Sequence, residues 1–113
     1  MNVSLNDLVM NVTVTSNNGV VNKDTIFRFS QNDSVITASY SGGKIVTGYL
    51  IGKIIESNLH FRFIQIDLAN NIDSGQSVCE IKKTDDGRIQ LVEHFEWDSI
   101  NGKGINIIEQ IFD

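Results

Sequence analysis

Residues 44–67 have the sequence KIVTGYLIGKIIESNLHFRFIQID, and this stretch decides the fold class. Two runs rich in Ile, Val, Leu and Phe flank the turn-forming residues Glu56-Ser57-Asn58. Apolar runs of this length, bounded by turn residues, predict two antiparallel β-strands, at Lys44–Ile55 and Leu59–Leu68. Elsewhere apolar residues recur at every second position, which is the period of a half-buried strand.

The same alternation predicts six further strands, at Leu8–Thr15, Val20–Gln31, Val35–Tyr40, Gly75–Lys83, Arg88–Trp97 and Lys103–Phe112. The residues between them favour tight turns. Asn17-Asn18-Gly19 predicts a hairpin, because Asn and Gly tolerate positive φ. Asp85-Asp86-Gly87 predicts a type I′ hairpin turn for the same reason. No stretch shows the apolar stripe of a helix.

Eight strands joined by short turns form a meander, and a meander that closes into a barrel has no exposed sheet edges. An eight-stranded barrel is just wide enough to be filled by side chains or to hold one small ligand. We therefore predict one all-β domain over residues 1–113, folded as a closed or nearly closed, calycin-like up-and-down barrel. A two-sheet sandwich is the alternative. Gly48 and Gly52, inside a predicted strand, indicate a strong bend or the close approach of a bulky group.

The composition excludes several classes of protein. The chain has 113 residues, of which 41% are hydrophobic and 20% charged, as in ordinary globular domains. Its net charge of −5 argues against a nucleic-acid partner. No apolar run approaches the ~18 residues of a membrane span, and no signal peptide is evident, so we expect a cytoplasmic location. His60, His94 and Cys79 are isolated, so we expect no metal site. We also expect no cofactor.

The run Tyr40–Gly52, YSGGKIVTGYLIG, carries a family resemblance. It resembles the Y-S-G-G-x-I-x-x-G-x-L-I-G core of a family of small bacterial all-β proteins that are often labelled N-acetylglutamate synthase. Shorter matches at Leu59–Phe63 and Asp86–Leu91 follow in the family's order, and the resemblance spans about residues 17–110. It implies a small cytoplasmic domain. Acetyl-CoA is usually held at a glycine-rich turn before a helix, which this sequence does not predict, so we do not expect acetyltransferase activity.

Alternation also places carboxylates on apolar faces. Glu93 shares its face with Leu91 and Phe95, and Glu109 shares its face with Ile105 and Ile107. We expect both carboxylates to point into the barrel from neighbouring strands. The candidate ligand-binding residues are Tyr49, Gln65, Glu80, Glu93, Trp97 and Glu109. No residue is assigned as catalytic.

A buried carboxylate must be paired, hydrogen-bonded or protonated, so these residues have a structural alternative. In that alternative they belong to a structural network with cations or with hydroxyls, namely Arg28, Arg62 or Lys82, or the hydroxyls of Tyr40 and Tyr49. The leading functional hypothesis is a noncatalytic protein that binds a small, partly apolar molecule in the barrel interior. The second is a protein-interaction or structural module with a filled core. The third is an isomerase or cyclase that uses the paired carboxylates.

The strand predicted at Leu59–Leu68 is partly apolar on both faces. Phe61 and Phe63 lie on one face, and Ile64 and Ile66 lie on the other. An exposed apolar face favours an interaction surface, and twofold dimers are the commonest assembly. A homodimer is therefore the protein partner that the sequence favours.

Overall fold

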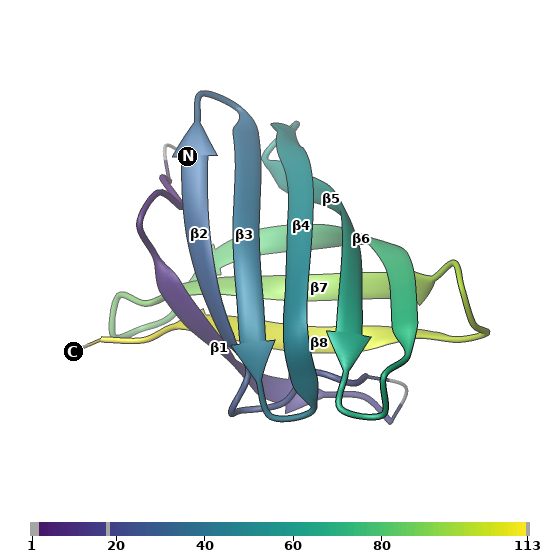
Figure 1. Cartoon of the computed structure of the whole chain (residues 1–113). Coiled ribbons are helices and arrows are strands. Elements are labelled where there is room, and N and C mark those ends of the chain that lie inside the picture. The colour runs from purple at the N-terminus through teal and green to yellow at the C-terminus, as the bar shows by residue number, and fades with distance from the viewer. Residues whose placement is uncertain (1–2, 18, 113) are drawn as a thin grey trace.

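The computed structural model describes residues 3–17 and 19–112. Eight antiparallel strands form one closed barrel, in which β8 pairs back to β1. Figure 1 shows β2 to β5 upright at the front, with β7 and β8 crossing behind them. The strands are β1 (Val9–Thr15), β2 (Ile26–Asn32), β3 (Val35–Gly42), β4 (Ile45–Ile55), β5 (Asn58–Asp67), β6 (Ile72–Lys83), β7 (Ile89–Trp97) and β8 (Lys103–Gln110). The predicted barrel is confirmed, and the sandwich alternative is wrong.

Side chains that alternate along the strands fill the barrel interior, and short segments close its two ends. Leu5 is fully buried near the end of β2, where its backbone N–H donates to the side chain of Gln31. At the other end the connection between β1 and β2, residues 16–25 without Asn18, lies over the interior and buries Val21. We call this connection the cover segment. Among the described residues no helix is long and apolar enough to cross a membrane.

Four aromatic side chains of the interior lie directly opposite glycines on the neighbouring strand. The pairs are Tyr40–Gly48, Phe61–Gly52, Phe63–Gly75 and Phe95–Gly104. A Cβ at any of these glycines would lie 2.0–2.5 Å from the nearest atom of another residue. At Gly48 that atom belongs to the Tyr40 ring, 2.4 Å away. The bulky group predicted beside Gly48 is therefore a side chain of the protein, whereas the atoms nearest to Gly52 are the His60 carbonyl oxygen and the Cβ and Cα of Phe61.

Strand β1 is the most weakly paired part of the barrel wall. Its register with β2 holds three residue pairs, from Val9↔Arg28 to Asn11↔Ile26, whereas every seam that lacks β1 has at least seven. A register shift between Val12 and Val14 interrupts its pairing with β8. Because of this shift Val14 is exposed although Met10 and Val12 are buried.

Two predictions about turns and strand ends need correction. The strand predicted at Val20–Gln31 begins at Ile26, because the preceding residues form the cover segment. The turn at Asp85-Asp86-Gly87 is not type I′, because only Gly87 has positive φ. It is a three-residue loop that ends in a left-handed glycine, with Thr84 N–H bonded to the Arg88 carbonyl. The hairpin predicted at Asn17-Asn18-Gly19 includes Asn18, which lies outside the described residues.

The contact between Tyr40 and Gly48 predicts the effect of a single methyl group. Gly48→Ala should lower the free energy of unfolding by about 2 kcal/mol, because the new Cβ overpacks the barrel interior. In a Tyr40→Leu background, which lacks the ring, the same change should cost less than half as much. Urea denaturation of the four proteins in this cycle measures the coupling. Equal costs in both backgrounds would show that the Tyr40 ring does not require glycine at position 48.

Candidate ligand-binding site

The structure divides the six predicted ligand-binding residues between the two faces of the barrel wall. Gln65, Glu93 and Trp97 are buried and point into the interior. Tyr49 is 60% exposed, Glu80 is exposed, and Glu109 is half-buried on the outer face. The expected inward orientation of Glu109 is therefore wrong, and the candidates Tyr49 and Glu80 also lie outside the barrel interior.

The expectation for Glu109 fails because β8 carries apolar residues on both faces. Ile105 and Ile107 lie on the outer face with Glu109, whereas Asn106 and Ile108 are buried inside. Alternation alone therefore selects the wrong face. The Glu109 carboxylate accepts a hydrogen bond of 2.6 Å from the Gln90 side chain on the outer face. It does not share a cavity with Glu93, and the paired carboxylates of the enzyme hypothesis are absent.

Glu80 and Tyr49 are turned outward by their neighbours. Ser77 and Cys79 of β6 are buried, so Val78 and Glu80 face solvent, where Glu80 lies 3.4 Å from His94. In β4, a register shift between Ile45 and Thr47 sets the alternation that buries Gly48 and Leu50. Tyr49 between them is exposed.

Inside the barrel Glu93 is the centre of a polar cluster from four strands. The Ser77 hydroxyl donates to Glu93 Oε2 at 2.6 Å, and Asn106 Nδ2 donates to Oε1 at 2.9 Å. The Asn106 oxygen in turn accepts from the Thr15 hydroxyl at 2.6 Å. Both carboxylate oxygens are thus satisfied by neutral donors. The structural alternative assigned cations to this network, but Arg62 forms its ion pair with Asp98 and Lys82 forms its ion pair with Glu80, both on the outer face.

Burial without a cation disfavours charge throughout this region. Burial raises the pKa of Glu93 above its ordinary value, and the hydrogen bonds from Ser77 and Asn106 offset part of that rise. Burial also raises the pKa of Tyr40, and the nearby Glu93 charge adds to the effect. Cys79 has a raised pKa for the same two reasons, so its buried thiol is a poor nucleophile. The interior therefore holds neutral hydrogen-bonding groups and one carboxyl group that resists ionisation.

Beside this cluster lies a small cavity walled mainly by aromatic rings. The Tyr40 hydroxyl donates to Gln65 Oε1 at 2.9 Å, and the Tyr40 ring stacks on Phe27 with centroids 4.5 Å apart. Phe63 and Trp97 meet edge to face at 5.3 Å. The cavity measures about 20 Å³, which suffices for one water molecule. Val20 and Val21 of the cover segment form its outer boundary.

Sequence reasoning missed Asn106 and Ser77 as members of the cluster. Asn106 lies between two isoleucines, and its polar groups are satisfied by residues distant in sequence. Ser77 could have been identified as an inward residue, because it lies two residues before the buried Cys79 on β6 and therefore on the same face. Tyr40 was considered for a buried network, and the structure places its hydroxyl on Gln65 instead of on a carboxylate. No three His, Cys, Asp or Glu side chains of the described residues gather in a way that could hold a metal ion.

The fold and interior define a closed, eight-stranded antiparallel barrel with an aromatic cavity and a few convergent polar groups. The family model described as avidin-like protein matches residues 3–111, so the chain belongs to the avidin-like protein family. No curated protein and no solved structure matches the chain.

The raised pKa of Glu93 predicts the sign of a pH effect. The folded state binds this proton more tightly than the unfolded state, whose carboxyl has its ordinary value of 4.5. The free energy of unfolding therefore falls as pH rises from 4.5 to the folded pKa, and Glu93→Gln abolishes this loss. The stability of Glu93→Gln relative to wild type should increase with pH over that interval, as measured by urea denaturation. A difference that is constant with pH would contradict the prediction.

Proposed function

We propose that the protein binds a small, partly apolar molecule inside the barrel, between the Glu93 cluster and the cover segment. The observation that supports this proposal is the composition of the interior under the cover segment. Tyr40, Phe63, Phe95 and Trp97 supply flat apolar walls, and Gln65, Glu93 and Asn106 supply polar groups. Mostly aromatic linings with few polar groups are typical of small-molecule sites. Membership of the avidin-like family and the closed barrel are consistent with such a function.

The geometry restricts the ligand. The cavity of about 20 Å³ has room for one water, so a larger molecule must displace Val20 and Val21 or their neighbours in the cover segment. Strand pairing does not hold this segment, whose bonds to the barrel include those from Ser16 N–H to the Ile105 carbonyl and from the Thr25 hydroxyl to the Gly42 carbonyl. The ligand should carry a hydrogen-bond donor toward Glu93 or Gln65 and a flat apolar part between the rings.

A protein-interaction or structural module is the second candidate, and two observations favour it. The cavity under the cover segment has room for about one water. In addition Tyr49 and Ile64 are direct partners on the outer face, and both are exposed. Apolar neighbours of this kind are typical of interaction surfaces, and a second copy of the chain is the expected partner.

Comparison of native and denatured masses of freshly purified protein tests the two candidates. A bound ligand would appear as extra mass that is lost on unfolding, and we expect this result. A native mass that is a clean multiple of the chain mass, with no extra component, would favour the interaction module. Biotin is the first defined probe to add, because streptavidin is an eight-stranded barrel that binds one biotin in its interior.

Ligand retention should depend on the interior polar groups. Glu93→Gln and Gln65→Leu should each reduce the retained ligand about tenfold, because the first replaces an acceptor oxygen of the cavity wall with a donating amide group and the second removes a hydrogen-bonding group. Glu80→Gln, on the outer face, is the matched control and should retain the ligand like wild type. Emission of Trp97, the single tryptophan, reports both folding and occupancy of the cavity. Equal retention in all three variants would refute the proposed site.

A further inference from the structure

A trough of about 1030 Å³ crosses the outer face of the barrel wall, and it is separate from the interior cavity. Its floor is the backbone of one cross-strand row, Gly52, Phe61, Ser77, Phe95 and Gly104. The side chains of that row are absent in the glycines or point into the barrel, so the outer surface above them is hollow. The row runs from β4 to β8, four strand spacings of about 4.8 Å each, or ~19 Å in length.

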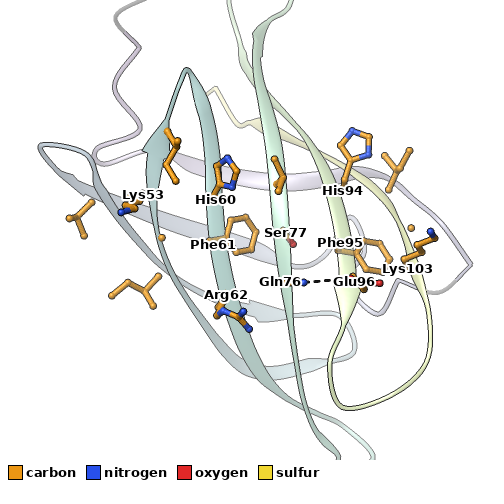
Figure 2. A pocket seen from close by; sticks show the side chains of 17 residues that line it. Lys53, His60, Phe61, Arg62, Gln76, Ser77, His94, Phe95, Glu96 and Lys103 are labelled. Atoms are coloured by element: carbon orange, nitrogen blue, oxygen red, sulfur yellow. Dashed lines mark hydrogen bonds between the residues drawn. The ribbon is translucent and has the colours of Figure 1, made fainter.

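The two flanking rows form the walls of the trough. We call the row Lys53, His60, Val78, His94 and Ile105 the histidine wall, and the row Ile51, Arg62, Gln76, Glu96 and Lys103 the arginine wall. Figure 2 shows Lys53, His60 and Arg62 toward one end and His94 and Lys103 toward the other, with the backbone of Phe61 and Phe95 between them.

Positive charge gathers in this trough although the chain is acidic. Three of the nine Lys and Arg residues and both histidines line it, whereas Glu96 is the only Asp or Glu of the described residues that does. The net charge of the whole chain is −5. The sign of the local charge is thus opposite to that of the whole protein, and it complements an anion.

The two ends of the trough differ in their charged groups, and this difference favours one orientation of an elongated anion. At the β4–β5 end Lys53 lies directly opposite His60, and neither has an ion-pair partner among the described residues. Arg62 lies two residues after His60 on β5. Its Nη1 atom lies 3.3 Å from Asp98 Oδ2 in an exposed ion pair, and such pairs contribute little stability. At the β7–β8 end Glu96 lines the trough, and Glu80 lies 3.4 Å from His94. An anionic group is therefore favoured at the β4–β5 end.

The remainder of the trough offers apolar surface on the histidine wall, whereas the arginine wall there carries Gln76, Glu96 and Lys103. Val78 and Ile105 on the histidine wall are 40% and 45% exposed, and they lie on either side of His94. Beyond β5 the next side chains along this wall are therefore largely aliphatic and accessible. Covering this surface with an apolar chain removes it from water, which favours binding.

Two other occupants fit less well. A peptide cannot add as an extra strand, because the barrel formed by the described strands is closed and leaves no sheet edge here. A second copy related by a twofold axis along the trough would place His60 of each copy over Arg62 of the other, so that cationic groups face each other.

We propose that the trough binds an elongated aliphatic carboxylate of the fatty-acid class. The carboxylate lies between Lys53, His60 and Arg62, and the chain runs along the floor past Val78 to Ile105. This site is outside the barrel and does not depend on the proposed interior ligand.

Binding of laurate to the intact protein, measured by equilibrium dialysis below its micelle concentration, tests the proposal. Laurate should bind at least about tenfold more tightly than dodecanol, which has the same chain without the charge. Lys53→Glu should weaken laurate binding about tenfold or more, and Lys53→Arg should preserve it. Lys44→Glu makes the same charge change outside the trough and should stay within about twofold of wild type.

The location of laurate distinguishes this site from the interior one. Bound laurate should shift the methyl NMR signals of Val78 and Ile105 and leave Trp97 emission unchanged, because Trp97 lines the interior cavity and not the trough. A change in Trp97 emission, with Val78 and Ile105 unaffected, would place laurate inside the barrel and overturn the trough proposal without opposing the interior site. Equal affinities for laurate and dodecanol, or an unaffected Lys53→Glu variant, would also overturn it.

Discussion

Closure of the eight strands into a ring is the constraint on which the rest of this structure depends. A closed wall fixes the interior volume, so every inward side chain takes space from the others. The chain accommodates large rings by placing a glycine directly opposite each of Tyr40, Phe61, Phe63 and Phe95. Two of these glycines, Gly52 and Gly104, also shape the outer surface, since they belong to the floor of the trough. One row of residues thus determines both the packing of the interior and the hollow outside it.

Polar groups inside and outside the wall are stabilised in different ways. Glu93 is buried, and neutral hydrogen bonds from Ser77 and Asn106 satisfy its oxygens. On the outer face Arg62 and Asp98 form an ion pair in contact with solvent. Ser77 connects the two environments, because its hydroxyl reaches Glu93 inside while its backbone lies in the trough floor. The proposed interior ligand therefore carries neutral polar groups, and the proposed trough ligand is an anion.

The sequence predicted the strands well because turn residues and alternation coincide over most of the chain. Strand β7 is the clearest case: Leu91, Glu93 and Phe95 share one face, and all three are buried as expected. The same reasoning selected the wrong face of β8, because this strand carries Ile105 and Ile107 on its outer face and Ile108 on its inner face. Its inward polar residue, Asn106, is stabilised by Thr15 and Glu93, which are adjacent in space and not in sequence. Local patterns cannot contain such information, so the site was harder to predict than the fold.

The short register between β1 and β2 gives the barrel an uneven resistance to thermal fluctuation. Local opening is easiest where the fewest backbone hydrogen bonds must break, and the three pairs of this seam follow directly on the cover segment. The wall should part there while the long β4–β5 and β5–β6 ladders stay intact. Exchange of molecules with the interior would then have a rate set by the opening of this seam. A molecule held inside would dissociate slowly for a kinetic reason, whatever the strength of its contacts with Glu93.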